Sequence, residues 1–183
     1  MCNTLPGTSI EVIHLEKGCS KSLFDGIFAA GGITLSQVCV MAGVEPYLVQ
    51  NWVKRGFVSS PRKRLYSRDQ FSRIIIINML RESIQIDKIC GLIRIIRGLP
   101  DDESDDLISD EELYHRYVDM LTENINTADP DSVLLAAERA TKDFSNSQPH
   151  AKKQLCGILQ VMLYAHSAAS LRRSAENALA ALR

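Results

Sequence analysis

The spacing of apolar positions in the first third of the chain predicts two short helices on either side of Gly43. The first helix has one apolar face, formed by Leu35, Val38, Cys39 and Ala42. Thr34 and Gln37 form a capping box before it, in which each side chain satisfies a backbone N–H of the other residue. Gly43 suits the position after a helix end, where a positive φ is needed. The sequence therefore predicts a helix, a tight turn and a change of direction.

The second helix is predicted over residues 46–55, because Pro46 is well tolerated at a first helical position and Gly56 follows the last turn. Its apolar stripe consists of Val49, Trp52 and Val53. The opposite face carries Tyr47, Gln50, Asn51 and Lys54. Asn and Gln can pair with adenine in a major groove, and Lys can contact guanine or phosphate. An ordinary solvated helix face is the alternative for this helix taken alone.

A basic hairpin, or wing, is predicted over residues 57–66, with apolar or aromatic ends around a Ser-Ser-Pro turn. Residues 46–75 contain seven basic side chains and one acidic side chain, in a chain of net charge −1. Clustered Lys and Arg beside such a helix would supply phosphate contacts. The alternative is a basic loop that is merely solvated.

Several further helices are predicted. One lies in the N-terminal segment, where Leu23, Phe24, Ile27 and Phe28 have near-helical spacing. Capping boxes at Ser67 and Ser109 begin two others, a fourth runs from Asp87 to about Arg97 before the stop at 98–100, and a fifth covers Val133 to about Phe144 after Asp129 and Pro130. The longest runs from about Pro149 to Leu182 and has an apolar stripe that needs a partner, either the preceding helices or a second chain.

Acidic side chains dominate residues 101–131, where twelve acids stand against one base. This part is predicted not to contact DNA phosphates. It is interpreted as a solvated linker or an acidic strip that separates two functional surfaces. The string DDESDD lacks the glycine and the bidentate glutamate of a calcium-binding EF-hand loop, so no metal site is predicted.

No other chemistry is predicted. The N-terminus lacks the pattern of a signal peptide, and the longest apolar run, 74–77, is too short to span a membrane, so a cytoplasmic protein is expected. The five cysteines are widely spaced and are expected to be reduced thiols. No nucleophile elbow, phosphate loop or cofactor motif is present, and no enzymatic activity is predicted. Tyr114, His115 and Tyr117 could line a ligand pocket, the alternative being aromatic core packing with His115 at the surface.

The segment from Ile33 to Ile96 resembles the DNA-binding domain of MerR-type regulators, through its I-T-L-S-Q-V opening, A-G-V turn, K-R-G-F helix end and R-L-Y-S string. More closely, GGITLSQVC, QNWVKRGFV, RIIIINMLR and DDESDDLISDEELY resemble an uncharacterised bacterial family of MerR-like regulators. The resemblance implies a winged helix-turn-helix, with DNA contacts from Tyr47, Gln50, Asn51, Lys54, Arg64 and Tyr66. It also implies dimerisation by an antiparallel coiled coil.

Two departures limit what the resemblance implies. MerR domains commonly carry Arg-Tyr-Tyr where this chain has Gln50, Asn51 and Trp52, so the operator cannot be copied and Trp52 is expected to be a core anchor. MerR relatives sense metals or drugs through a C-terminal part, but the cysteines here lack the clustered spacing of metal sensors.

Together these patterns predict a mainly α protein. The predicted parts are an N-terminal helical extension (1–32), a MerR-like winged helix-turn-helix domain (33–98), an acidic linker and helix (99–131) and a C-terminal helical region for dimerisation or effector binding (132–183). The predicted function is sequence-specific binding of double-stranded DNA by a homodimeric transcriptional regulator, with an unknown small molecule or protein as a possible effector. The alternative is a protein-interaction adapter that binds a partner through its acidic or C-terminal helical part. The predicted DNA contacts are Thr34, Ser36, Tyr47, Gln50, Asn51, Lys54, Arg55, Arg62, Lys63, Arg64, Tyr66 and Arg68.

Overall fold

The computed structural model describes residues 3–97 and 106–182, and within them the chain is mainly helical, as predicted. The helices are α1 (Cys19–Ile27), α2 (Leu35–Ala42), α3 (Pro46–Lys54), α4 (Arg68–Leu80), α5 (Ile86–Arg97), α6 (Asp110–Met120), α7 (Pro130–Ala140) and α8 (Ala151–Ala180). The short strands are β1 (Asn3–Thr4), β2 (Glu11–Val12), β3 (Ile33–Thr34) and β4 (Leu65–Tyr66). They form two separate antiparallel pairs, β1 with β2 and β3 with β4.

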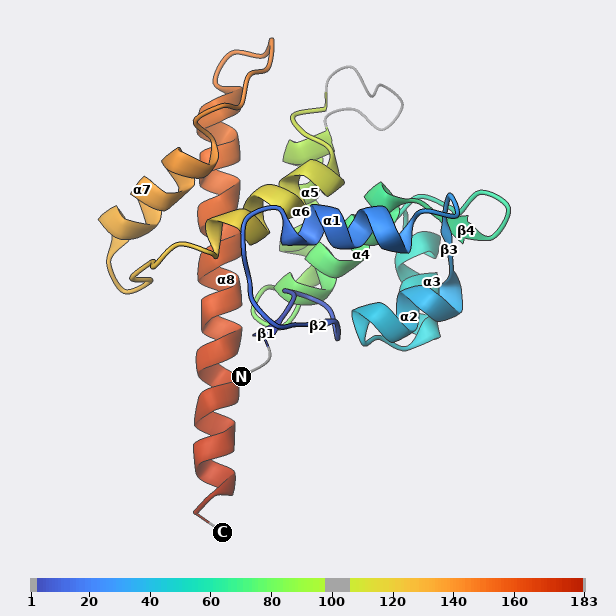
Figure 1. The fold of residues 1–183 in the computed structure, drawn as a ribbon, viewed down its shortest axis with the longest axis horizontal. Coiled ribbons are helices and arrows are strands. Elements are labelled where there is room, and N and C mark those ends of the chain that lie inside the picture. The colour runs from blue at the N-terminus through green and yellow to red at the C-terminus, as the bar shows by residue number, and fades with distance from the viewer. Residues whose placement is uncertain (1–2, 98–105, 183) are drawn as a thin grey trace.

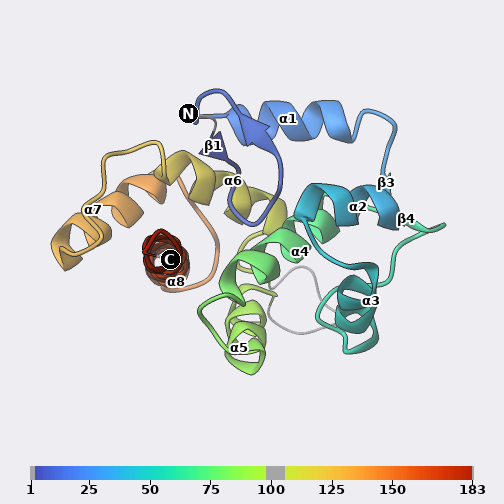
Figure 2. The ribbon, with the colours of Figure 1, turned by 90° about the horizontal axis from the view of Figure 1, so that it is seen from below.

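Helix α4 lies at the centre of the molecule, with α2 on one side and α5, α6 and α8 around the rest (Figures 1 and 2). Its residues 74–77 are four consecutive isoleucines, and all four are buried. A helix that is apolar all round must be covered on several sides, so this run explains why neighbours from both halves of the chain pack on α4.

The N-terminal segment is an integral part of this core. It contains the predicted helix, α1, and also the β1–β2 hairpin, which the sequence analysis missed. Leu5 is fully buried, and the Tyr114 hydroxyl donates a 2.9 Å hydrogen bond to the carbonyl oxygen of Pro6. Gly7 has a φ of +72°, and a Cβ there would lie 2.2 Å from the carbonyl oxygen of Ile75. Only glycine fits so close to α4.

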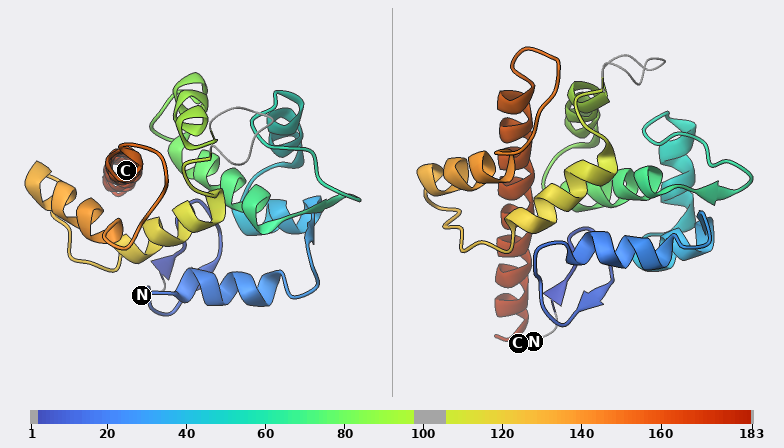
Figure 3. Two further views of the ribbon diagram at one scale, coloured as in Figure 1. Left: turned by 90° about the horizontal axis from the view of Figure 1, so that it is seen from above. Right: turned by 45° about the horizontal axis from the view of Figure 1, so that its top comes forward.

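Helix α8 has two parts with different environments. Its N-terminal part packs against α7 and α4, and buried side chains continue as far as Ala169. From residue 170 to 182 every side chain is exposed. The views agree that this end projects beyond the rest of the molecule (Figures 1 and 3).

Most predicted helix starts are confirmed, because local side chains fix them. Thr34, Ser67, Ser109 and Asp129 each accept a hydrogen bond from a backbone N–H of the helix that follows. One predicted end was wrong, since α7 ends at Ala140 and not near Phe144. The predicted stop at 98–100, the boundary between residues 98 and 99, and the first five residues of the acidic string lie outside the described residues. No helix in the described ranges is long and apolar enough to cross a membrane.

Candidate nucleic-acid interface

Helix α2 and the turn after it set the direction of α3. The capping box at Thr34 is complete, with a 2.9 Å bond from the Thr34 N–H to Oε1 of Gln37. Gly43 ends α2 in the left-handed conformation, with a φ of +64°. Val44 beyond it is buried, and Pro46 begins α3 two residues later. The helix, turn and helix therefore follow the sequence-based prediction.

The inner face of α3 is fixed in the core. Val49 is fully buried and Trp52 is 3% exposed. The guanidinium of Arg81 lies 5.8 Å from the centre of the Trp52 ring, within the range of a cation–π contact. Trp52 is thus a core anchor, as expected from its place in the apolar stripe.

The outer face of α3, here called the recognition face, consists of Tyr47, Gln50, Asn51 and Lys54. All four side chains are exposed, and Tyr47 is 65% exposed. In the described residues, none of these four side chains has an ion-pair partner or a hydrogen bond to another side chain. Two amides, a phenol and an ammonium group are therefore presented together on a rigid helix.

The wing (residues 57–66) differs from the predicted hairpin. Its tight turn is at Lys63 and Arg64, closed by a 2.8 Å bond from the Leu65 N–H to the Arg62 carbonyl oxygen, and not at Ser59–Pro61. Strand β4 does not pair with residues 57 and 58; it pairs with β3, which precedes α2. The wing residues before the turn are instead bound by Gln70.

Gln70 is a positioning residue that the sequence analysis used only as half of a capping box. Its Oε1 accepts from the Ser67 N–H at 2.9 Å, as a capping box requires. Its Nε2 lies 3.0 Å from the carbonyl oxygens of both Ser59 and Ser60. One side chain therefore begins α4 and fastens the first limb of the wing. The sequence holds no local signal for the second role, since the partners are ten and eleven residues away.

The tip of the wing has an unusual backbone. Lys63 and Arg64 have φ values of +49° and +65°, although neither is glycine. Two successive residues of positive φ are the requirement of a type I′ turn, for which Asn-Gly is preferred. Left-handed conformations at non-glycine residues cost roughly 1 kcal/mol each, and such strain collects at functional sites. The wing thus has two long basic side chains at positions where Asn and Gly would adopt the backbone conformation with less strain.

The seven basic residues of 46–75 separate into two groups. Lys54, Arg62, Lys63 and Arg64 are exposed and have no ion-pair partner in the described part of the chain. The guanidinium of Arg55 lies 3.6 Å from Asp87 and 4.4 Å from the centre of the Phe57 ring. Arg68 and Arg73 are bound to carboxylates of other helices. Only four of the seven positive charges are thus available to a ligand.

The ion pairs of Arg68 and Arg73 hold α4 against α6, and we call them the α4–α6 seam. Arg68 contacts Asp25 at 2.7 Å and Glu111 at 3.3 Å. Arg73 Nε donates a 2.7 Å hydrogen bond to Asp110, whose side chain is 2% exposed. The placement of Arg68 differs from its predicted role as a DNA contact, because two carboxylates already neutralise it.

Three other predicted DNA contacts, Tyr66, Thr34 and Ser36, differ in how exposed their side chains are and in whether their hydroxyls are already bound. Tyr66 is 4% exposed, so its ring is part of the core and is not available to DNA. Burial also raises the pKa of its phenol. Thr34 and Ser36 are exposed at the start of α2. The Thr34 hydroxyl is engaged with Gln37, which leaves Ser36 as the free hydroxyl of this turn.

The acidic segment is not simply a solvated strip. Where the structure describes it, Asp110 is buried against Arg73, and Glu111 contacts Arg68. Arg116 binds Glu112 at 2.7 Å and Asp143 at 2.8 Å. Two acids of the first turn of α6, Asp110 and Glu111, therefore bind α4, and the third, Glu112, pairs within α6, at the helix end where the dipole also favours negative charge.

The residues Tyr114, His115 and Tyr117 pack in the core, but the expected surface position of His115 was wrong. His115 is 8% exposed, and its Nδ1 lies 2.9 Å from the Ser20 hydroxyl. Its Nε2 lies 3.5 Å from Glu111, and burial lowers its pKa despite this carboxylate. Ser20, His115 and Glu111 thus form a row like that of a hydrolase, yet Ser20 is fully buried and a substrate could not reach its hydroxyl.

In the described residues, no group of three His, Cys, Asp or Glu side chains could hold a metal ion. The profile of a family described as a domain of unknown function (DUF1836) matches residues 41–117. This span contains the whole of α3, the wing, α4 and α5, and most of α6. No curated protein and no solved structure matches the chain.

Proposed function

We propose that this protein is a sequence-specific DNA-binding transcriptional regulator with a MerR-like winged helix-turn-helix domain. The observation that carries the proposal is the coincidence of two features at one end of the molecule (Figure 2). The recognition face presents amides and a phenol, and Lys54, Arg62, Lys63 and Arg64 add four positive charges without ion-pair partners in the described residues.

The chemistry of the two features is complementary. A helix fits the major groove, where Asn and Gln can form paired hydrogen bonds to adenine and Lys can donate to guanine. The cations of the wing would contact phosphates, which position a protein on the duplex without reading its sequence. Gln50 and Asn51 would therefore determine which sequence is bound, and Arg62, Lys63 and Arg64 how tightly any sequence is bound.

The test begins with selection of duplexes from a random pool by the full-length protein, followed by fluorescence anisotropy at two salt concentrations. We expect Lys54→Ala and Arg64→Ala each to weaken binding several-fold and to reduce the slope of log K against log salt by about 1. Lys142→Ala and Lys153→Ala are the controls, since they remove the same charge at the other end of the molecule. Absence of enrichment, or equal losses in the controls, would contradict the proposal.

We further propose that the protein acts as a homodimer that pairs through α8. Exposed apolar or small side chains alternate at intervals of three and four residues along its outer face: Val161, Tyr164, Ala168, Leu171, Ala175 and Ala178. This is the heptad spacing of a coiled-coil seam, and a second copy presents the same spacing. Leu171 is 70% exposed and lies in the middle of the projecting part. Two recognition helices would then meet successive half-sites of a palindromic operator.

Light scattering gives the mass in solution. We expect the wild type to be a dimer. Leu171→Lys should be a monomer, because an ammonium group between the two paired α8 helices would lose its hydration. Ile13→Lys is the control, since Ile13 is 77% exposed and lies on the N-terminal hairpin. A wild-type monomer at all concentrations would contradict the dimer. If that monomer also bound no duplex and captured one stoichiometric protein, the adapter alternative would be favoured.

A further inference from the structure

A cleft of about 540 Å³ lies at a place that the proposed function does not use. Three segments that are far apart in the sequence form it: the start of α1, α6 with the residues just after it, and the end of α7. In Figure 2 α7 lies at the opposite end of the molecule from α3. The volume is in the range of sites that hold small molecules.

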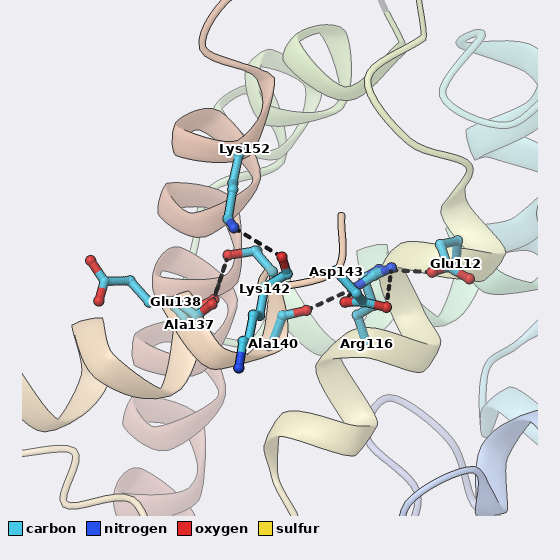
Figure 4. A network of polar contacts seen from close by, with 9 residues as sticks. Glu112, Arg116, Ala137, Glu138, Ala140, Lys142, Asp143 and Lys152 are labelled. Carbon is cyan, nitrogen blue, oxygen red and sulfur yellow. Dashed lines mark hydrogen bonds and ion pairs between the residues drawn. The ribbon is translucent and has the colours of Figure 1, made fainter. Parts of the chain in front are cut away.

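Each of the four carboxylates that line the cleft already has a partner among the other residues that line it. Arg116 binds Glu112 and Asp143 (Figure 4), and Arg139 donates to Glu123 at 2.9 Å. Asp119 accepts a 2.8 Å hydrogen bond from the Gly18 N–H. The Arg116 side chain also lowers the pKa of the Asp143 carboxyl. Three of these carboxylates are thus bound to arginines and the fourth to a backbone N–H, so they offer little to a cation.

The lysines of the cleft are in the opposite situation. Lys21 lines it from α1, Lys17 from the residues just before α1, and Lys142 from the residues just after α7. All three are exposed, and in the described ranges none has a carboxylate partner. In Figure 4 the Lys142 ammonium group has no dashed contact and points away from the Arg116 ion pairs. The charge that remains available in the cleft is therefore positive.

We propose that this cleft binds a small, multiply charged anion whose charged groups are phosphates or carboxylates. Three ammonium groups on flexible stems can converge on one such ligand, each with three donors. Attraction between charges is stronger in a partly enclosed cleft than on an open surface, because the effective dielectric constant is lower.

The proposal does not rest on DNA binding, and its test uses no nucleic acid. Calorimetric titration of the full-length protein with inorganic pyrophosphate and, separately, with citrate distinguishes a phosphate site from a carboxylate site, with sodium chloride of equal ionic strength as reference. We expect saturable binding of at least one of the two. We also expect a rise in melting temperature, because the ligand binds only the folded chain.

Two variants of equal charge locate the site. Lys21→Gln/Lys142→Gln should weaken binding at least tenfold, whereas Lys88→Gln/Lys153→Gln should leave it unchanged. Circular dichroism melting of both variants checks that they fold. In the wild type, the amide resonance of Gly18, which lines the cleft, should shift when the anion is added. Absence of saturable binding by both anions, or equal weakening in the two variants, would overturn the proposal. The second result would mean attraction by net charge alone.

Discussion

The tip of the wing and the α4–α6 seam contain basic side chains that are four to ten residues apart in the sequence, but the two regions use them differently. At the tip, Lys63 and Arg64 are exposed and have no ion-pair partner in the described residues. In the seam, Arg68 and Arg73 are neutralised by Asp25, Glu111 and Asp110. Positive charge in the sequence therefore marks two things, a surface for a ligand and a joint between helices.

The difference arises from the elements that each region meets. Helix α6 begins with three consecutive acids, and its N-terminus lies against α4. Arg68 and Arg73, which face this end, form ion pairs with its carboxylates. The wing is a loop with a two-residue turn, and in the part of the chain that the structure describes no carboxylate pairs with its cations. A local count of charge overstates the available charge wherever a chain also supplies its own counterions.

Removal of Arg73 should have the largest effect. Arg73→Ala leaves Asp110 buried without its guanidinium partner, and breaking such a pair costs about 3–5 kcal/mol. Urea denaturation monitored by circular dichroism would measure the loss. Arg64→Ala is the matched control at the wing tip and should change stability by less than about 0.5 kcal/mol. Similar losses in both variants would remove the distinction between the regions.

Replacement of the strained turn should act in the other direction. Lys63→Asn combined with Arg64→Gly supplies the residues that a type I′ turn prefers. We expect the free energy of unfolding to rise by about 1 kcal/mol, because the left-handed strain is relieved. On the proposed function, DNA affinity should fall at the same time. A variant that is neither more stable nor weaker on DNA would show that the turn residues are interchangeable.

The pH dependence of stability should reveal His115, which is buried, and His166, which is half-buried. Burial lowers the pKa of His115, and burial followed by Arg173 lowers that of His166. The unfolded chain, with an ordinary His pKa near 6.5, then binds protons that the folded chain does not. Stability is therefore complete above about pH 6.5 and falls as the pH decreases below it.

Melting temperatures between pH 7 and pH 5 test this dependence. We expect His115→Gln to flatten the fall, whatever its effect at pH 7, and His14→Gln, which changes an exposed residue, to leave the fall unchanged. An unchanged fall in the His115 variant would mean that protonation of His115 does not oppose folding.

The smallest effect is expected for Arg55→Ala. Its pair with Asp87 is open to solvent, with side-chain exposures of 44% and 88%, and such pairs contribute at most about 1 kcal/mol. The same urea titration should show a loss far below that of Arg73→Ala. A loss as large as that of Arg73→Ala would mean that the solvent exposure of an ion pair does not decide how much the pair stabilises this protein.

Much of the segment from α2 to α3 could be predicted because its signals are local. Thr34 with Gln37, Gly43 and Pro46 act within one turn of the helices they begin or end, so their spacing in the sequence is their spacing in the structure. The recognition face followed in the same way from the helical period. The wing could not be predicted at the same level, because β4 pairs with β3, about thirty residues earlier.

The sequence by itself determined the mainly helical class, the boundaries of most helices, and which side of α3 is apolar, since each of these depends on residues within a few positions of one another. Only the tertiary structure decided which charges remain available. Arg68 and Tyr66 carry the same local signals as Arg64 and Tyr47, yet the former two are held by the core and by acids from α1 and α6. A charge or a ring becomes a contact surface only where distant parts of the chain leave it uncovered.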